Sequence, residues 1–292
     1  MLEAIEHALI TPFVEFSFMR RALVGTVVLG IGAAPLGVFL MLRRMSLTGD
    51  AMAHAILPGA ALGYLVAGLS LPAMTIGGIG AGLIVALLSG LVARTTVLRE
   101  DASLAAFYLI SLALGVLLVS LRGNGVDLLH LLFGNVLALD DPTLILIAGV
   151  TSCTLPVFAL IYRGLVAECV DPGFLQTVRG RGSITHMVFL TLVVANLVAG
   201  FQALGTLLVV GIMMLPAVSA RFWSRNLSGL IVIAVLIAIF STYTGLLASY
   251  HFSVPAGPAV VFSAGLVYIF SILFGHANGI VGKLLSSRHL EA

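Results

Sequence analysis

Two pairs of side chains have the types and spacing needed to hold a metal cation. Asp50 and His54 are four residues apart, so on a helix the carboxylate and the imidazole share one face. A hard oxygen donor beside a borderline nitrogen donor suits Zn²⁺ or Mn²⁺. Asp127 and His130, three residues apart, could receive a metal at the entrance of a pathway, and His251 lies in an outer turn close to where a substrate would enter or leave. These five residues are the candidate metal ligands, with Asp50 and His54 as the principal pair.

Each candidate also has a simpler structural explanation. Asp50 could cap the N-terminus of a helix while His54 hydrogen-bonds to a neighbouring helix. Asp127, His130 and His251 could be solvated or interfacial residues of loops. Small and helix-interrupting residues beside the principal pair favour a function, because an interruptible, closely packed helix is typical of a transport pathway. These residues are Gly49, Pro58, Gly59 and Gly63.

The composition indicates what kind of structure must position these residues. Of 292 residues, 60% are hydrophobic and 9% are charged, and the mean hydropathy is +1.19. Soluble chains carry about 25% charged residues, so this chain is an integral membrane protein and neither a nucleic-acid binder nor a soluble enzyme. Cys153 and Cys169 lack CxxC spacing, which excludes a disulfide framework and a cysteine metal cluster. No GxxxxGK[ST] motif is present, so ATP hydrolysis cannot be placed on this chain.

Long stretches without Asp, Glu, Lys or Arg predict the membrane spans. A helix needs about 20 apolar residues to cross the bilayer, so the longest stretches must each hold two spans. We expect these stretches to divide at 70–72, at 201–203 and at 250–255. The sequence therefore predicts an all-α polytopic membrane protein of about nine transmembrane helices, with eight or ten left open. The expected spans are 18–42, 51–69, 72–93, 102–121, 143–163, 184–200, 203–220, 226–249 and 256–275.

Basic residues predict the orientation, because they are retained on the cytoplasmic side during insertion. They cluster in alternate loops and in the C-terminal tail, whereas the loop 122–142 carries three aspartates against one arginine. We therefore expect the basic loops in the cytoplasm and the N-terminus outside, although Arg20 and Arg21 run against the rule. One domain is expected, with an N-terminal amphipathic segment at 1–17, a transmembrane domain at 18–276 and a cytoplasmic tail at 277–292.

The longest cytoplasmic loop, 163–183, predicts a short docking helix at about 170–182. An acidic residue followed by proline provides the N-cap and the first turn, and three apolar residues provide one face of the helix. A glycine between two arginines then ends the helix. A merely solvated loop would not need this apolar face, so we expect the helix to dock on a cytoplasmic partner. The residues concerned are Asp171, Pro172, Phe174, Leu175, Val178, Arg179, Gly180 and Arg181.

Four further polar residues lie in or beside the apolar stretches without a partner at ligand spacing. We expect them to be helix-end or interhelical hydrogen-bonding groups. They are His186, Asn196, Gln202 and His276.

The segment around the principal pair resembles the zinc and manganese ABC importer permeases, the membrane subunits of high-affinity bacterial metal uptake systems. The resemblance is carried first by residues 43–59, RRMSLTGDAMAHAILPG. Further short sequence blocks resemble later blocks of the family and occur in the same order as in the family, so the similarity extends from about residue 18 to 276. They are REDA at 99–102, VDLLH at 126–130, FGNVL at 133–137, LPA at 215–217 and VPAGP at 254–258.

This resemblance implies a homodimeric bundle of the vitamin B12 importer type, that is, a type II ABC permease. It implies a dimer of cytoplasmic ABC ATPase subunits and a periplasmic or surface metal-binding protein as partners, in the bacterial inner membrane. The segment from Val170 to Gly182 would be the coupling helix that contacts the ATPase, and Asp50 and His54 match family positions implicated in metal coordination. No bound cofactor is implied, since the metal is the transported substrate. Each protomer could hold its own metal, or two protomers could share one across the dimer axis.

The expected function is therefore that of a permease subunit that moves zinc by alternating access, with manganese or iron as the alternative cargo. An oxygen and nitrogen pair accommodates either zinc or manganese, so these residues do not decide between the two metals. The competing class is a self-sufficient secondary transporter or channel, in which Asp50 relays cations or protons. The pairing of Asp50 with His54 and the docking loop favour the importer.

Overall fold

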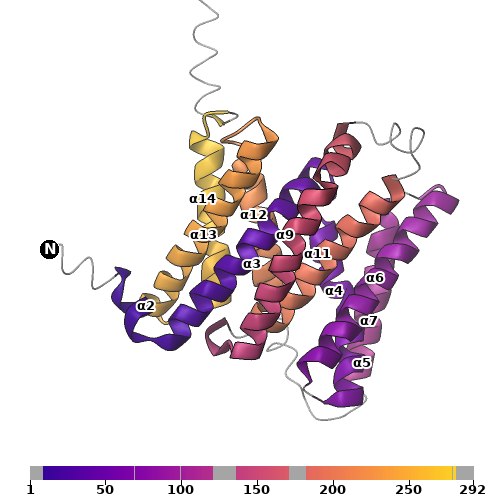
Figure 1. Cartoon of the computed structure of the whole chain (residues 1–292), viewed down its shortest axis with the longest axis horizontal. Helices are drawn as coiled ribbons and strands as arrows, with labels where there is room; N and C mark the ends of the chain where they lie inside the picture. Colours follow the sequence, from indigo (N-terminus) through magenta and orange to yellow (C-terminus); the bar gives the residue numbers. More distant parts are fainter. Residues whose placement is uncertain are drawn as a thin grey trace, which may run out of the picture.

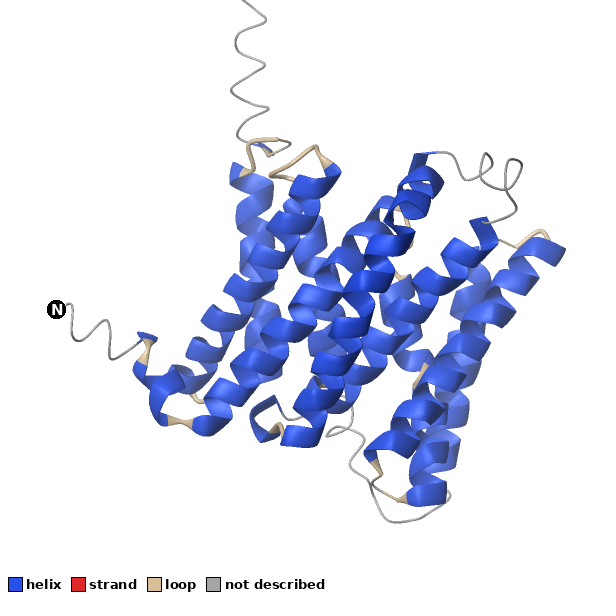
Figure 2. Ribbon diagram, viewed as in Figure 1, coloured by secondary structure: helices blue, strands red, loops and turns tan. Residues whose placement is uncertain are grey.

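The protein folds into a bundle of helices, which confirms the predicted fold class. In the computed structural model, residues 9–68, 70–98, 100–120, 136–170, 182–277 and 279–280 are described, and this part of the chain contains helices and no strand (Figures 1 and 2). The elements are α2 (Thr11–Glu15), α3 (Ser17–Leu42), α4 (Thr48–Ala55), α5 (Leu57–Ala67), α6 (Leu71–Thr95), α7 (Glu100–Ser120), the 3-10 helix η1 (Val136–Ala138), α9 (Asp141–Val170), α11 (Gly182–Leu204), α12 (Thr206–Ala220), α13 (Leu227–Phe252) and α14 (Ala256–Phe274).

Eight helical segments in the described part of the chain are long and apolar enough to cross a membrane. Every predicted span corresponds to helix, but α12 has only 15 residues and is shorter than a usual span. The second span is divided at Ile56 into α4 and α5, because Pro58 in the first turn of α5 has no N–H with which to continue the ladder. Asp50 and His54 therefore lie on a separate short helix of 8 residues.

Two predicted boundaries differ from the structure, and a third is confirmed. The break expected at 201–203 lies at Gly205, whose φ of +86° is a conformation that glycine adopts readily. The break expected at 250–255 is confirmed, because α13 ends at Phe252, the chain turns at Ser253 with φ +52° and α14 begins at Ala256. α9 runs to Val170, so the cytoplasmic loop predicted from 163 begins later. Polar residues mark these ends poorly, because a helix ends where the backbone leaves the helical conformation.

α3 and α11 form the centre of the bundle, with 72% of the apolar window of each buried. α3 packs against α9, α12 and α13, and α11 packs against α6, α9 and α12. Figure 1 places α13 and α14 on one side and α5, α6 and α7 on the other. The peripheral helices α6, α7, α9 and α14 bury only 22–28% of their windows, so their apolar side chains form a surface suited to lipid. α4 packs against α6, α7, α11 and α12, which places it among the interior helices.

The isolated polar residues connect neighbouring helices. Asn196 of α11 donates from Nδ2 to Oγ1 of Thr154 in α9 at 2.8 Å, and the Gln202 side-chain oxygen accepts from Thr75 of α6 at 3.1 Å. These two bonds confirm the predicted interhelical role. His276 lies just after α14, at a helix end as predicted.

The two termini are described only in part. Phe13 of α2 is buried and stacks on Tyr243 of α13, with ring centroids 5.2 Å apart. Residues 1–8 and 281–292 lie outside the described residues, so the amphipathic segment at 1–17 and the cytoplasmic tail at 277–292 remain predictions.

Candidate metal site

α4 brings Asp50 and His54 together, as their spacing predicts. His54 Nε2 lies 3.7 Å from Asp50 Oδ1, which is too long for a hydrogen bond. Two donors at about 2.1 Å from one metal ion lie about 3.0–3.6 Å apart at ordinary coordination angles. A small side-chain rotation would therefore let both atoms bind one ion.

The helix-cap explanation for Asp50 lacks the hydrogen bond that it requires. The N-cap residue of α4 is Leu47, and no side-chain cap bond is formed there. Asp50 lies in the first turn, where the positive end of the helix dipole favours a carboxylate. Its side chain is 60% exposed in the isolated chain, so a cation can approach the carboxylate.

His54 has one ring nitrogen directed toward Asp50 and one enclosed by the bundle. Its Nδ1 is buried and has no hydrogen-bond partner among the described residues. A metal ligand must present an unprotonated nitrogen, and Nε2, which faces Asp50, is the ring nitrogen placed to do so. The ring of Tyr108 from α7 stacks on the imidazole, with centroids 6.2 Å apart and an interplanar angle of 29°. Tyr108 thus limits rotation of His54, a role that the sequence did not predict because Tyr108 lies on a different helix.

The pair supplies two donors and leaves the other coordination positions open. Across the described residues, no group of three or more His, Cys, Asp or Glu side chains could enclose a metal ion. A cage with four protein ligands is typical of structural metal sites, whereas an open site exchanges its metal. The arrangement of Asp50 and His54 therefore suits a metal in transit.

Among the described residues, His251 does not join this pair. His251 is exposed in the last turn of α13, where its ring contacts Tyr250 with centroids 5.3 Å apart. Asp127 and His130 lie outside the described residues, as do the eight docking residues between 171 and 181. Their metal-binding and docking roles remain predictions.

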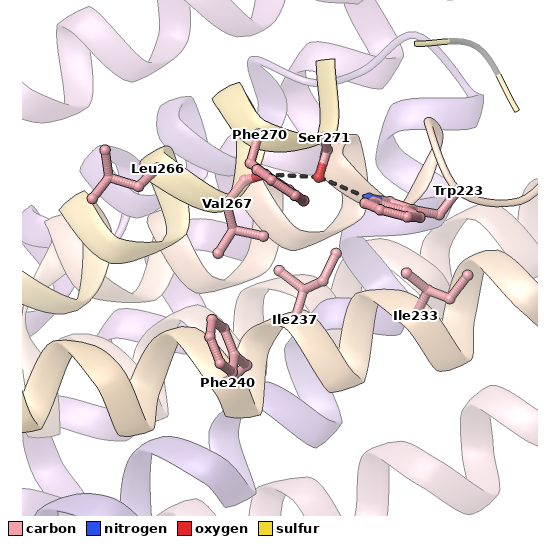
Figure 3. Close-up of a pocket in the computed structure, with 8 residues that line it drawn as sticks. All are labelled: Trp223, Ile233, Ile237, Phe240, Leu266, Val267, Phe270 and Ser271. Carbon is pink, nitrogen blue, oxygen red and sulfur yellow. Dashed lines mark hydrogen bonds between the residues drawn. The ribbon is translucent and has the colours of Figure 1, made fainter. Parts of the chain in front are cut away.

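A separate apolar groove lies between α13 and α14. It encloses about 660 Å³ and is lined by Trp223, Ile233, Ile237, Phe240, Leu266, Val267, Phe270 and Ser271 (Figure 3). Trp223 donates from Nε1 to Ser271 Oγ at 2.8 Å, and Ser271 donates to the Val267 carbonyl at 2.7 Å. The lining contains no carboxylate or imidazole, so this groove is not a metal site.

Comparison with known proteins identifies the bundle. The model of a family described as the ABC 3 transport family matches residues 15–275. The chain belongs to the ABC 3 transport family. It is accordingly a multi-pass permease of the bacterial inner membrane and a transport subunit without enzymatic activity, and the ATPase is a separate chain.

Individual relatives extend over nearly the whole chain. The manganese transport system membrane protein MntC of Listeria monocytogenes is 31% identical over 91% of this chain and 94% of its own length. The manganese import system permease protein ScaB of Streptococcus gordonii is 30% identical over 88% of this chain and 91% of its own length. The solved structure of PsaBC from Streptococcus pneumoniae in complex with Fab has a TM-score of 0.83 and 28% identity, covering 99% of this chain and 100% of that one.

The contact between Tyr108 and His54 leads to a prediction. Tyr108→Ala should weaken binding of Mn²⁺ or Zn²⁺ by roughly 2- to 10-fold, because an aromatic contact worth about 0.5–1.5 kcal/mol no longer orients the imidazole. Tyr108→Phe keeps the ring and should bind metal as the wild type does. Isothermal titration of the purified permease measures both affinities. Equal loss in both variants would show that the hydroxyl, and not the stacked ring, supports the site.

Proposed function

We propose that this chain is the permease subunit of an ATP-driven importer that moves manganese(II) past Asp50 and His54. The observation that carries the proposal is the pair itself, which lies on a short interior helix and is open to further ligands. Membership of the ABC 3 transport family supports transport driven by a separate ATPase and argues against a secondary transporter or channel.

Manganese replaces zinc as the proposed cargo. MntC and ScaB carry manganese in their names, and a further relative, 29% identical over 94% of this chain, is the chelated iron transport system membrane protein YfeD of Yersinia pestis. The expectation of zinc gains no support from these names, and the manganese alternative fits them better. Carboxylate oxygen and imidazole nitrogen both bind Mn²⁺, so the donor set agrees with this choice.

The proposed transport cycle uses alternating access. A metal-binding protein outside the membrane delivers the cation to a dimer of permease chains, where Asp50 and His54 replace part of its hydration shell. Because only two donors come from the protein and water fills the remaining coordination positions, the metal can dissociate quickly from the site. A pair of ATPase subunits, docked through the segment 171–181, then drives the opening of the permease toward the cytoplasm.

Uptake by reconstituted vesicles tests this function. The permease, its ATPase and its binding protein are placed in proteoliposomes, and uptake of radioactive manganese, zinc and iron is compared with and without ATP. We expect ATP-dependent uptake of manganese that ceases when the ATPase is inactivated by mutation. ATP-dependent uptake of zinc or iron alone would contradict the cargo, and uptake driven by a proton gradient without the ATPase would contradict the whole proposal.

A further inference from the structure

A buried charged cluster joins three helices at the end of the bundle predicted to face the cytoplasm. Arg43 directly follows α3, Glu168 lies in the last turn of α9, and His186 is the fifth residue of α11. Arg43 Nη2 lies 3.2 Å from Glu168 Oε2 and 2.6 Å from His186 Nδ1. One guanidinium nitrogen therefore connects all three helices.

The chemistry of the cluster makes Arg43 its shared member. Arginine has no acceptor, so Arg43 donates through Nη2 and Nδ1 of His186 accepts. The guanidinium also lies over the ring of Phe189, 5.4 Å from its centroid, in a cation–π contact. A lysine ammonium ends closer to the backbone and has no planar face to lie over Phe189, so it could not keep all three contacts.

Burial makes the cluster act as one unit. The side chains of Arg43 and Glu168 are only 14% and 7% exposed, and His186 is 8% exposed. Separating a buried ion pair leaves an uncompensated charge in a low-dielectric environment, which is strongly unfavourable. The ends of α9 and α11 are therefore expected to move with Arg43 and not away from it.

The position of the cluster in the chain gives this unit a role. Glu168 lies just before the segment 171–181 and His186 just after it, so Arg43 holds both flanks of the segment predicted to dock on the ATPase. On its other side, Arg43 is separated from α4 by a turn of four residues, 44–47. α4 carries Asp50 and His54 and also packs directly on α11.

We propose that Arg43 is the positioning residue that transmits movement of the ATPase-docking segment to the metal-site helix α4, through its ion pair with Glu168 and its hydrogen bond to His186. This proposal rests on the proposed function, in which the segment 171–181 docks on the ATPase and α4 holds the metal. When docking moves the ends of α9 and α11, Arg43 moves with them and pulls the turn 44–47. α4 then changes its orientation and redirects the metal ligands.

Three variants test the cluster without removing the fold. Arg43→Lys keeps the charge but lacks the planar guanidinium, and Glu168→Gln keeps the shape but removes the carboxylate. His186→Leu releases α11 and leaves the ion pair of Arg43 and Glu168 intact, so it remains informative where the two charge variants assemble poorly. The matched control is Arg21→Gln, which breaks the exposed 2.9 Å ion pair between Arg21 and Asp141 at the opposite ends of the same helices α3 and α9.

The readout is the amount of metal transported per ATP hydrolysed by the assembled complex. We expect the ratio to fall at least 10-fold in Arg43→Lys and Glu168→Gln and about 3-fold or more in His186→Leu. Basal ATP hydrolysis and the metal affinity of the permease should stay within 2-fold, and Arg21→Gln should keep the wild-type ratio. Wild-type ratios in all three cluster variants, or equal losses in the Arg21→Gln control, would overturn the proposal.

A second readout does not depend on the cargo. A trifluoromethylphenylalanine introduced in place of Tyr108 reports, by ¹⁹F NMR, on the surroundings of His54 when a non-hydrolysable ATP analogue closes the ATPases. We expect a shift of the resonance in the otherwise wild-type complex that is lost in Arg43→Lys. This result would support coupling even if the wild type imported no manganese, whereas an undiminished shift in Arg43→Lys would refute coupling even if manganese uptake were confirmed.

Discussion

Asp50→Asn is expected to reduce metal uptake at least about 100-fold while the complex still assembles. Asparagine has the same shape but lacks the negative charge that offsets the cation. Loss of an outer-shell partner of a metal site alone costs about 10- to 100-fold, and loss of a direct anionic ligand should cost more. Uptake by proteoliposomes measures the loss, and basal ATP hydrolysis, which uses other residues, should remain within 2-fold.

A matched variant separates the metal path from a general effect of charge. Asp141, like Asp50, lies in the first turn of a helix and is largely exposed, with 69% of its side chain accessible. Asp141→Asn should transport metal within 2-fold of the wild type. Normal uptake by Asp50→Asn would show that the Asp50 carboxylate does not bind the metal and interacts only with the positive end of the α4 helix dipole.

Gly77→Ala is expected to prevent α5 and α6 from packing, with a loss of stability of about 3 kcal/mol or more. The two helices cross at Gly59 and Gly77, where a Cβ on either residue would overlap the carbonyl oxygen of the other. Overpacking usually costs about 1–3 kcal/mol when side chains can adjust, and backbone atoms can adjust less. The thermal transition of the purified permease and the yield of assembled complex measure this effect.

Two glycines of the same helix serve as controls for this prediction. Gly80 and Gly90 of α6 have open space where a Cβ would stand. Gly80→Ala and Gly90→Ala should be neutral or stabilising by up to about 1 kcal/mol, because alanine favours helix. A loss in Gly80→Ala or Gly90→Ala equal to that in Gly77→Ala would refute the close contact of α5 and α6.

The composition and the distribution of charges predict the helical membrane bundle well, because apolar length alone decides which segments can enter a bilayer. They locate the ends less well. Gln202 was expected to mark a break, yet it remains helical and the chain turns at Gly205 instead, and α9 continues to Val170 past the loop expected from residue 163.

The principal site pair could be predicted because Asp50 and His54 lie on one turn of one helix, where spacing alone fixes proximity. The cluster of Arg43, Glu168 and His186 could not be predicted, because its members lie on three helices and only the packing brings them together. The resemblance to metal importers predicted the family correctly. It did not predict the cargo, because oxygen and nitrogen donors accept several divalent metals.

Pulsed EPR of Mn²⁺ bound to the purified permease tests the central claim most directly, with wild type and His54→Gln compared at a saturating metal concentration. A nitrogen ligand gives a characteristic ¹⁴N modulation of the electron spin echo, whereas oxygen ligands alone give none. We expect this modulation in the wild type and its loss in His54→Gln. Modulation that persists unchanged in His54→Gln, or a wild-type spectrum without it, would show that the metal does not bind at Asp50 and His54.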